Sequence, residues 1–254
     1  MEENKILEER LIEGNEMSSF HRDKKKSILF GWKKLFLFFL TYLAASFILG
    51  VIIAIPFAII NIANGNDGVE EILASHWLLY IDAVALIISL LIFKSARLFL
   101  KGLFSFKQLK QAKTYLYLGL AFVILFGSQF IIMNVLSLEK SEDQIGTFGL
   151  NDLSFQWWNL VLFYIAFTVI TPIKEEILFR GLLYRFLDKK IHFWVGFIVS
   201  SLIFGVLHSG HMISATIMGM VFVGLYKLTK SLIVPITFHI LWNLYAITGL
   251  LLFM

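Results

Sequence analysis

Long apolar runs dominate this sequence and limit what it can fold into. Several reach or exceed the roughly 20 residues that cross about 30 Å of hydrocarbon. Of the 254 residues, 58% are hydrophobic and 16% are charged, whereas soluble domains are nearer to a quarter charged. No strand-like alternation of barrel length recurs, and only helices and closed barrels span membranes. We therefore predict an all-α protein, a polytopic transmembrane helical bundle.

About seven spans are predicted from these runs. They cover residues 35–63, 77–93, 115–138, 157–178, 193–207, 212–226 and 232–253. The fourth span is expected to continue as an amphipathic tail to residue 187. The chain then divides into a cytosolic N-terminal segment (1–30), N-terminal transmembrane helices (31–150) and a C-terminal transmembrane core with four helices (151–254).

The basic residues predict the orientation, because Lys and Arg collect on the cytoplasmic side of membranes. Of the 22 Lys and Arg residues, eight lie in 1–34, six in 94–113, five in 174–190 and two at 227 and 230. The remaining one, Lys140, lies among carboxylates in the second predicted outer loop. We therefore expect a multi-pass integral membrane protein with a cytoplasmic N-terminus, in a bacterial plasma membrane. The net charge of +4 reflects this topology and indicates no nucleic-acid partner.

The first 30 residues are polar and contain two features. Residues 6–12 have helical apolar spacing, and residues 21–26 form a basic cluster that is expected to contact anionic lipid. The charged lead is too long, and the apolar run too extended, for a cleaved signal peptide. The chain has no Cys, so disulfides, thiol catalysis and Cys-bound zinc are excluded.

The segment KEEILFR holds two adjacent carboxylates and an arginine. Glu176 and Arg180 are one helical turn apart on the same face, which favours an ion pair. Glu175 points about 100° away, and a carboxylate in a low-dielectric pocket suits a general base. The alternative is a helix end whose charges reach the cytoplasmic surface, and Lys174, Arg185 and Lys189 fit that interpretation as well.

Two further pairs share helix faces in the last two-fifths of the chain. Phe204 and His208 form one pair, and His239 and Asn243 form the other. A histidine at the end of a span is commonly interfacial, and His and Asn also make hydrogen bonds between membrane helices. Together, His239 and Asn243 could instead hold a developing oxyanion. His211 is a second histidine candidate, and Asp82 is expected at the outer interface without a role.

The ordered motifs EExxxR, FxxxH and HxxxN resemble those of the CPBP family, the CAAX-protease and bacteriocin-processing (Abi) intramembrane endopeptidases. The resemblance covers about residues 157–250 and implies that 151–254 is the catalytic core. It implies that Glu175 and His208 activate a water that attacks a peptide carbonyl. His239 and Asn243 would stabilise the oxyanion, while Glu176 and Arg180 match the remaining motif positions.

The resemblance also raises the question of a metal, because the family is usually described as metalloproteases. The chain lacks HExxH. A divalent metal such as zinc would need Glu175, His208 and His239 brought together from different helices. A metal-free, glutamate-activated water accounts for the same residues, and both alternatives stay open at this point.

The implied substrate is a membrane-associated peptide or protein tail at the lipid bilayer, in peptide maturation or bacteriocin immunity. The competing hypotheses are a non-catalytic membrane scaffold or regulator with the same fold, and a proton-coupled transporter. The catalytic hypothesis requires Glu175 and His208 to lie close together. We expect a deep fourth helix and a short, tilted fifth helix around a cavity open to the cytoplasm.

Overall fold

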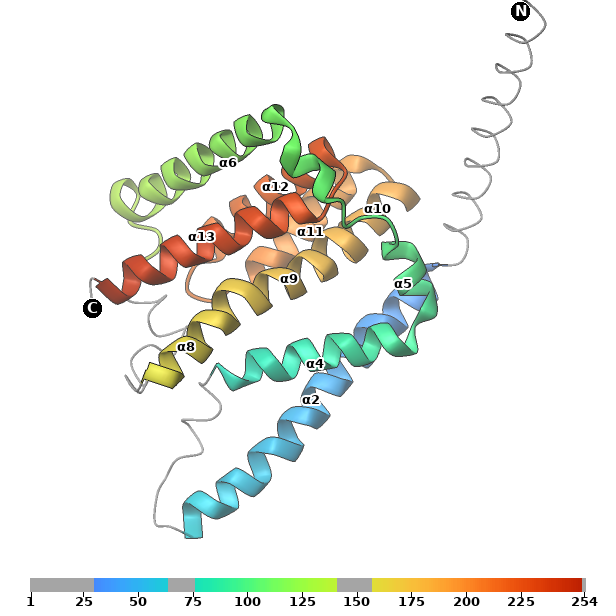
Figure 1. Cartoon of the computed structure of the whole chain (residues 1–254), viewed down its shortest axis with the longest axis vertical. Helices are drawn as coiled ribbons and strands as arrows, with labels where there is room; N and C mark the ends of the chain where they lie inside the picture. The colour runs from blue at the N-terminus through green and yellow to red at the C-terminus, as the bar shows by residue number, and fades with distance from the viewer. Residues whose placement is uncertain (1–29, 64–75, 141–156, 253–254) are drawn as a thin grey trace, which may run out of the picture.

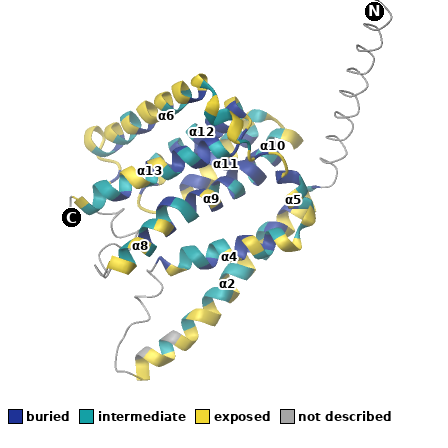
Figure 2. Ribbon diagram, in the orientation of Figure 1, coloured by how far each residue is buried: buried dark blue, intermediate teal, exposed yellow. Residues whose placement is uncertain are grey.

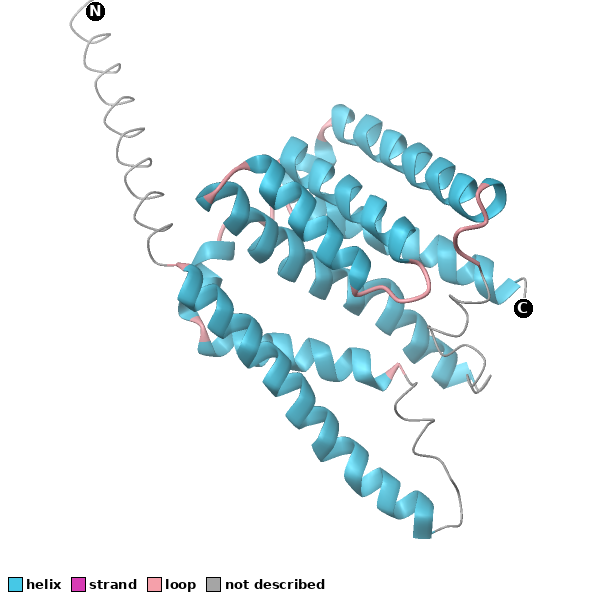
Figure 3. Ribbon diagram, turned by 180° about the vertical axis from the view of Figure 1, so that it is seen from behind, coloured by secondary structure: helices cyan, strands magenta, loops and turns pink. Residues whose placement is uncertain are grey.

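The computed structural model describes residues 30–63, 76–140 and 157–252, and the regular structure in these ranges is helical (Figures 1 and 3). Its main helices are Trp32–Ala63 (α2), Trp77–Ile92 (α4), Lys94–Leu100 (α5), Ala112–Phe130 (α6), Phe193–Val206 (α11), Met212–Thr229 (α12) and Ile233–Leu252 (α13). The all-α bundle is confirmed. The features predicted at 6–12 and 21–26, the region boundary near 150 and most of both predicted outer loops lie outside the described residues.

Within the described residues, four helices are long and apolar enough to cross a membrane. They are α2, α6 with the π-helical turn Ile131–Val135 (η2), α12 and α13. A fifth appears if α4 and α5, which bend by 100° at Phe93, count as one span. The helix α5 and the short 3₁₀ turn Phe106–Lys110 (η1) lie where the sequence indicated only a basic loop.

The predicted fourth span is one long helical segment. It consists of α8 (Trp157–Ile165), α9 (Thr171–Glu175) and α10 (Arg185–Lys190), joined by the π-helical stretches Ala166–Ile170 (η3) and Glu176–Tyr184 (η4). At 1.5 Å per residue such a segment is roughly 50 Å long. Glu175 therefore lies near the middle of the segment and not at its cytoplasmic end. Interrupting π turns of this kind are frequent at functional sites.

Many residues on the outer helices of the bundle are exposed (Figure 2), and a large share of these exposed residues are apolar. On α2, for example, Phe47 is 73% exposed and Leu43 is 61% exposed. Apolar side chains at this exposure are stable in lipid and costly in water. The main buried core extends from α2 to α13 and includes Phe38, Phe204, Phe222 and Leu232.

Two glycines let α11 approach α12 closely. A Cβ atom added at Gly205 would lie 2.7 Å from the backbone oxygen of Met212, and one at Gly219 would lie 3.0 Å from Cα of Ser201. Small residues permit this kind of close backbone contact between membrane helices. The turn that joins the two helices contains Gly210 at φ 81°, a conformation that favours glycine. The short α11 and this turn fix where His208 lies.

Polar contacts connect the helix ends at each of the two opposite ends of the bundle. At the first end, the Ser231 hydroxyl donates to the Ser105 carbonyl (2.8 Å), and Lys227 pairs with Asp188 (3.1 Å). At the other end, the Glu139 carboxylate accepts hydrogen bonds from the backbone N–H groups at the start of α12, Ile213 (2.6 Å) and Ser214 (3.3 Å). We call these the basic end and the Glu139 end.

Candidate active site

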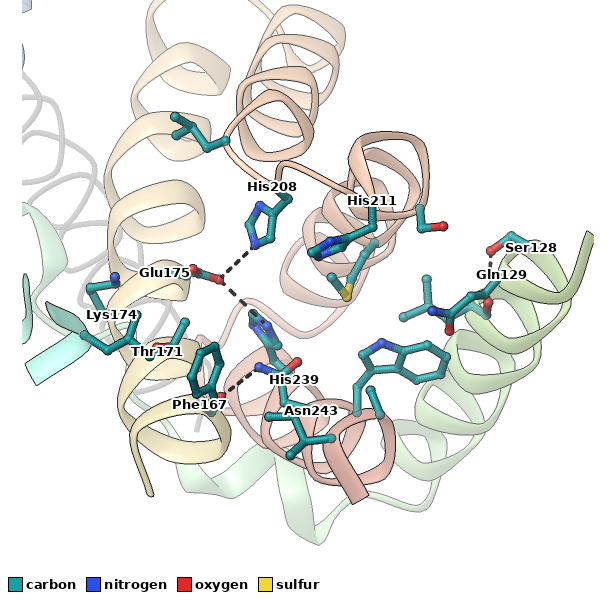
Figure 4. A pocket seen from close by; sticks show the side chains of 18 of the residues that line it. Ser128, Gln129, Phe167, Thr171, Lys174, Glu175, His208, His211, His239 and Asn243 are labelled. Carbon is teal, nitrogen blue, oxygen red and sulfur yellow. Dashed lines mark hydrogen bonds and ion pairs between the residues drawn. The ribbon is translucent and has the colours of Figure 1, made fainter. Parts of the chain in front are cut away.

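Three of the predicted site residues converge around one carboxylate oxygen (Figure 4). The distance from Glu175 Oε2 to Nε2 is 3.8 Å for both His208 and His239. These side chains come from α9, from the turn after α11 and from α13. Because 3.8 Å is longer than a direct hydrogen bond, the three atoms surround a position where a small group could be held.

The other ring nitrogen of each histidine is engaged in a way that restricts its tautomer. His208 Nδ1 lies 2.6 Å from the Phe204 carbonyl oxygen, which can only accept, so Nδ1 carries the hydrogen. His239 Nδ1 lies 3.1 Å from Glu176 Oε1. When Glu176 is ionised, Nδ1 of His239 is also the donor. Both neutral rings then present a bare Nε2 toward Glu175.

Glu176 and Arg180 form the predicted ion pair, and the pair is fully inside the protein. Their closest atoms are 2.9 Å apart, and the side chains are 0% and 1% exposed. Arg180 also donates to the Gly219 carbonyl at 3.3 Å. The alternative of charges reaching the cytoplasmic surface is therefore wrong for these two residues. Arg185 is partly buried and Lys189 is exposed, and both lie over the Phe99 ring.

Aromatic rings join the ion pair to the histidines. The Arg180 guanidinium lies 4.4 Å from the centroid of Phe204 and 4.8 Å from that of Phe222. The Phe204 ring also contacts His208 (4.3 Å between centroids), and the Phe222 ring contacts His239 (4.5 Å). A desolvated cation over aromatic faces is stabilised by about 2 kcal/mol. The phenylalanine of FxxxH thus holds both the arginine and the histidine in place.

Asn243 also lies at the cavity, one turn after His239. Its Nδ2 donates to the Phe167 carbonyl oxygen at 2.9 Å, which leaves the second N–H of the amide for another acceptor. His239 can donate from Nε2 only when its ring is cationic or when Glu176 carries the proton. Asn243 can therefore act as the predicted oxyanion donor without any change of protonation. His239 can do so only under one of the two conditions just given.

The cavity has a volume of about 380 Å³, a polar floor and largely apolar walls. Glu175, His208, His239 and Asn243 form the floor. The walls come from α4, α6, α13 and the α11–α12 turn, and include Leu78, Leu79, Leu125, Leu207, Trp242, Ala246 and Ile247. Thr171, one turn before Glu175, adds a buried hydroxyl to the lining. Such a cavity suits a polar reaction on an apolar segment.

Comparison with known proteins agrees with this arrangement. Residues 157–245 match a family model described as "Type II CAAX prenyl endopeptidase Rce1-like". The resemblance to the CPBP family is thereby confirmed for this region. A Bacillus subtilis (strain 168) protein named "Putative membrane peptidase YdiL" is 36% identical over 88 residues, which are 34% of this chain and 36% of that protein. The match thus spans about a third of the relative's length, and no solved structure matches the chain.

The Rce1-like region contacts the N-terminal helices through an ion pair that was not predicted from the sequence. Lys174, next to Glu175, lies 3.0 Å from Asp82 of α4, and its side chain is 8% exposed. The Ser46 hydroxyl of α2 also donates to Asp82. The expectation that Asp82 has no role is therefore wrong, because it neutralises the lysine beside the proposed base. The sequence signal was a carboxylate within an apolar run.

Replacement of Asp82 by Asn should destabilise the protein, because Lys174 would stay buried without a charged partner. We expect the free energy of unfolding to fall by about 1–3 kcal/mol, measured by thermal unfolding in detergent. Asp188→Asn is the matched control, since the Lys227–Asp188 pair is more exposed, at 37% and 24%, and such pairs contribute about 0–1 kcal/mol. Equal losses in the two variants would contradict the structural role of Asp82.

The second histidine candidate, His211, lines the same cavity of the Rce1-like region. Its ring lies 5.3 Å from that of His208. Burial, and then the positive charge of a protonated His208, lowers the pKa of His211 to about 4, while Glu139 acts in the opposite direction. His211 is thus neutral at neutral pH. Glu139 was assigned no function from the sequence, yet it fixes the start of α12 directly after this histidine.

The position of the cavity differs from the expectation in one respect. The fifth helix is short, as predicted, and Glu175 lies near the middle of the fourth helical segment, which brings Glu175 level with His208. However, the lining residues lie toward the Glu139 end, and none belongs to the basic connections at 94–113, 185–192 or 227–232. The expected opening toward the basic end is therefore wrong. The buried layer around Arg180, Phe204 and Phe222 closes the cavity on that side.

Proposed function

We propose that the chain is an intramembrane endopeptidase that cleaves a membrane-associated peptide or protein tail with an activated water. The observation that carries this proposal is Glu175 Oε2. It is buried, makes no hydrogen bond with any described protein group, and lies between two imidazole Nε2 atoms. An unpaired carboxylate oxygen at membrane depth is costly, and a water or substrate group in the cavity would satisfy it.

In the proposed reaction, Glu175 and His208 hold a water between Oε2 and Nε2. Glu175 accepts a proton from that water as its oxygen bonds to the peptide carbonyl carbon. The carbonyl π electrons move onto the oxygen, which the free N–H of Asn243 stabilises. The tetrahedral intermediate then expels the amine, which takes up the proton held by Glu175. One water is consumed, and a carboxylic acid and an amine are released.

The same three side chains could hold a divalent metal. Two bare Nε2 atoms and a carboxylate form an N₂O donor set, and both Nδ1 atoms are held by an oxygen, as is usual for metal-bound histidines. When bound, zinc would supply Lewis-acid activation of water. Zinc needs its donors at about 2.0–2.2 Å. In the described part of the chain, no group of three or more His, Cys, Asp or Glu residues is close enough to form a ready cluster.

Asn243 provides a specific prediction within this mechanism. Asn243→Ala removes the free N–H that faces the cavity and should lower turnover by about 10²–10³-fold. Substrate affinity should change far less, because the lost interaction forms chiefly in the transition state. Steady-state kinetics on a cleaved peptide separate the two parameters. A rise in KM with unchanged kcat would assign Asn243 to substrate binding.

A direct test of the activity uses purified protein in lipid vesicles and a library of membrane-anchored peptides, with Glu175→Gln as the inactive control. Cleavage by the wild type alone, identified by mass spectrometry of the products, would support the endopeptidase. Ion flux or proton movement without cleavage would favour a transporter. Absence of both would favour a scaffold or regulator that retained the fold.

A further inference from the structure

We infer that the cavity opens on the membrane side opposite the basic connections, so the substrate segment reaches the site from outside the cytoplasm. That a substrate enters the cavity rests on the proposed function. The side on which the cavity opens does not depend on that function. The two groups of helix ends defined above carry very different charges. The charge difference identifies the cytoplasmic end of the bundle, and the lining residues show at which end the cavity lies.

The basic end gathers most of the described cations. Arg185 of α10 donates to the Phe99 carbonyl of α5, and Lys227 pairs with Asp188. The backbone N–H of Leu232 donates to the Leu103 carbonyl at 2.8 Å. These contacts bring together the connections that contain residues 94–113, 185–190 and 227–230, which together hold 11 of the 22 Lys and Arg residues. Under the positive-inside rule this end lies in the cytoplasm.

The Glu139 end has the opposite composition. The sequence between α2 and α4 (64–75) holds Asp67, Glu70 and Glu71 without any Lys or Arg. The sequence from 136 to 156 holds four carboxylates and one cation, Lys140. An acidic or neutral connection on the outer side is what the rule allows.

The cavity belongs to the Glu139 end. Its lining includes Leu78 and Leu79 near the start of α4, and Ser128 and Gln129 near the end of α6. Around the α11–α12 turn it includes Leu207, His208, His211 and Ser214. Leu207 is 67% exposed at this rim. Toward the basic end, Arg180 and the rings of Phe204 and Phe222 fill the interior completely, with side chains at most 1% exposed. Among the described residues, the approach to Glu175 is therefore open at the Glu139 end and closed at the basic end.

The substrate class follows from this position. The site is accessible to a segment that is already across the membrane or in its outer leaflet, such as the juxtamembrane part of an exported peptide or anchored protein. The largely apolar walls favour a segment with apolar side chains beside the scissile bond.

The absence of Cys in the chain makes single-cysteine labelling a clean test. Lys140→Cys lies at the Glu139 end, Gln129→Cys lies in the cavity wall, and Lys107→Cys lies at the basic end. In intact cells, a membrane-impermeant maleimide should modify Lys140→Cys and Gln129→Cys, and modify Lys107→Cys only after permeabilisation. Reaction of Lys107→Cys alone in intact cells would overturn the orientation. A silent Gln129→Cys beside a reactive Lys140→Cys, in both conditions, would overturn the opening of the cavity at that end.

A second arm separates this inference from the proposed activity. Sealed vesicles with the Lys140→Cys side outward should cleave added peptides that insert only into the outer leaflet, and vesicles of the reverse orientation should not. Cleavage confined to the reverse orientation would overturn the inference and leave the endopeptidase intact. Labelling as expected without cleavage in either orientation would overturn the endopeptidase and leave the orientation intact.

Discussion

Glu175→Gln should reduce peptide cleavage by at least about 10²–10⁴-fold, the range typical for loss of a general base. The amide keeps the size and planarity of the carboxylate but cannot accept a proton from water at neutral pH. One of its amide atoms would still fit between the imidazoles of His208 and His239, as Glu175 Oε2 does. The loss should therefore appear in kcat, with the thermal stability of the protein close to that of the wild type.

Two comparisons make this result specific. Asp188→Asn is the same chemical change on the same long helical segment, outside the cavity, and should retain nearly full activity. His208→Ala should lose activity to a similar extent as Glu175→Gln, and the double variant should lose little more, because residues that act as a unit are not additive. A folded Glu175→Gln protein that cleaves at the wild-type rate would exclude Glu175 from the mechanism.

Much of the helical framework was predictable, because long apolar runs and their interruptions depend on local sequence. The expected spans 77–93, 193–207 and 232–253 each end within one residue of α4, α11 and α13. The π-helical stretches around Glu176 were not predictable, since they depend on packing against other helices. The fourth helical segment continues to residue 190. Its last turns contain charged residues, so the apolar run from which the fourth span was predicted ends earlier.

The site was predictable where residues share one helix face, and less so where it depends on contacts between helices. The Glu176–Arg180 pair follows from i, i+4 spacing alone. The contact of Arg180 with Phe222, and of Lys174 with Asp82, joins helices far apart in the sequence, and no spacing rule reaches across that distance. The direction of the cavity was mistaken for the same reason, because Glu175 was placed by counting residues from the cytoplasm.

Arg180→Met should strongly destabilise the protein, because it leaves Glu176 buried without its main partner. Breaking a buried ion pair by removing one side costs about 3–5 kcal/mol, and the contacts with Phe204 and Phe222 would weaken as well. Thermal unfolding in detergent measures the loss. Arg97→Met, a matched change at an exposed arginine that donates to the carbonyls of Leu90 and Leu91, should cost far less.

A second substitution distinguishes the lost charge balance from lost packing. In the double variant Arg180→Met with Glu176→Gln, both charges of the pair are removed, and the side-chain oxygen of the introduced glutamine can still accept from His239 Nδ1. If the buried charge causes the instability, the double variant should recover more than half of the stability lost by Arg180→Met alone. If the double variant is as unstable as the single one, packing of the guanidinium between the two rings is the main contribution. Arg180 would then be chiefly a spacer that keeps α11 and α12 at the distance that His208 and His239 require.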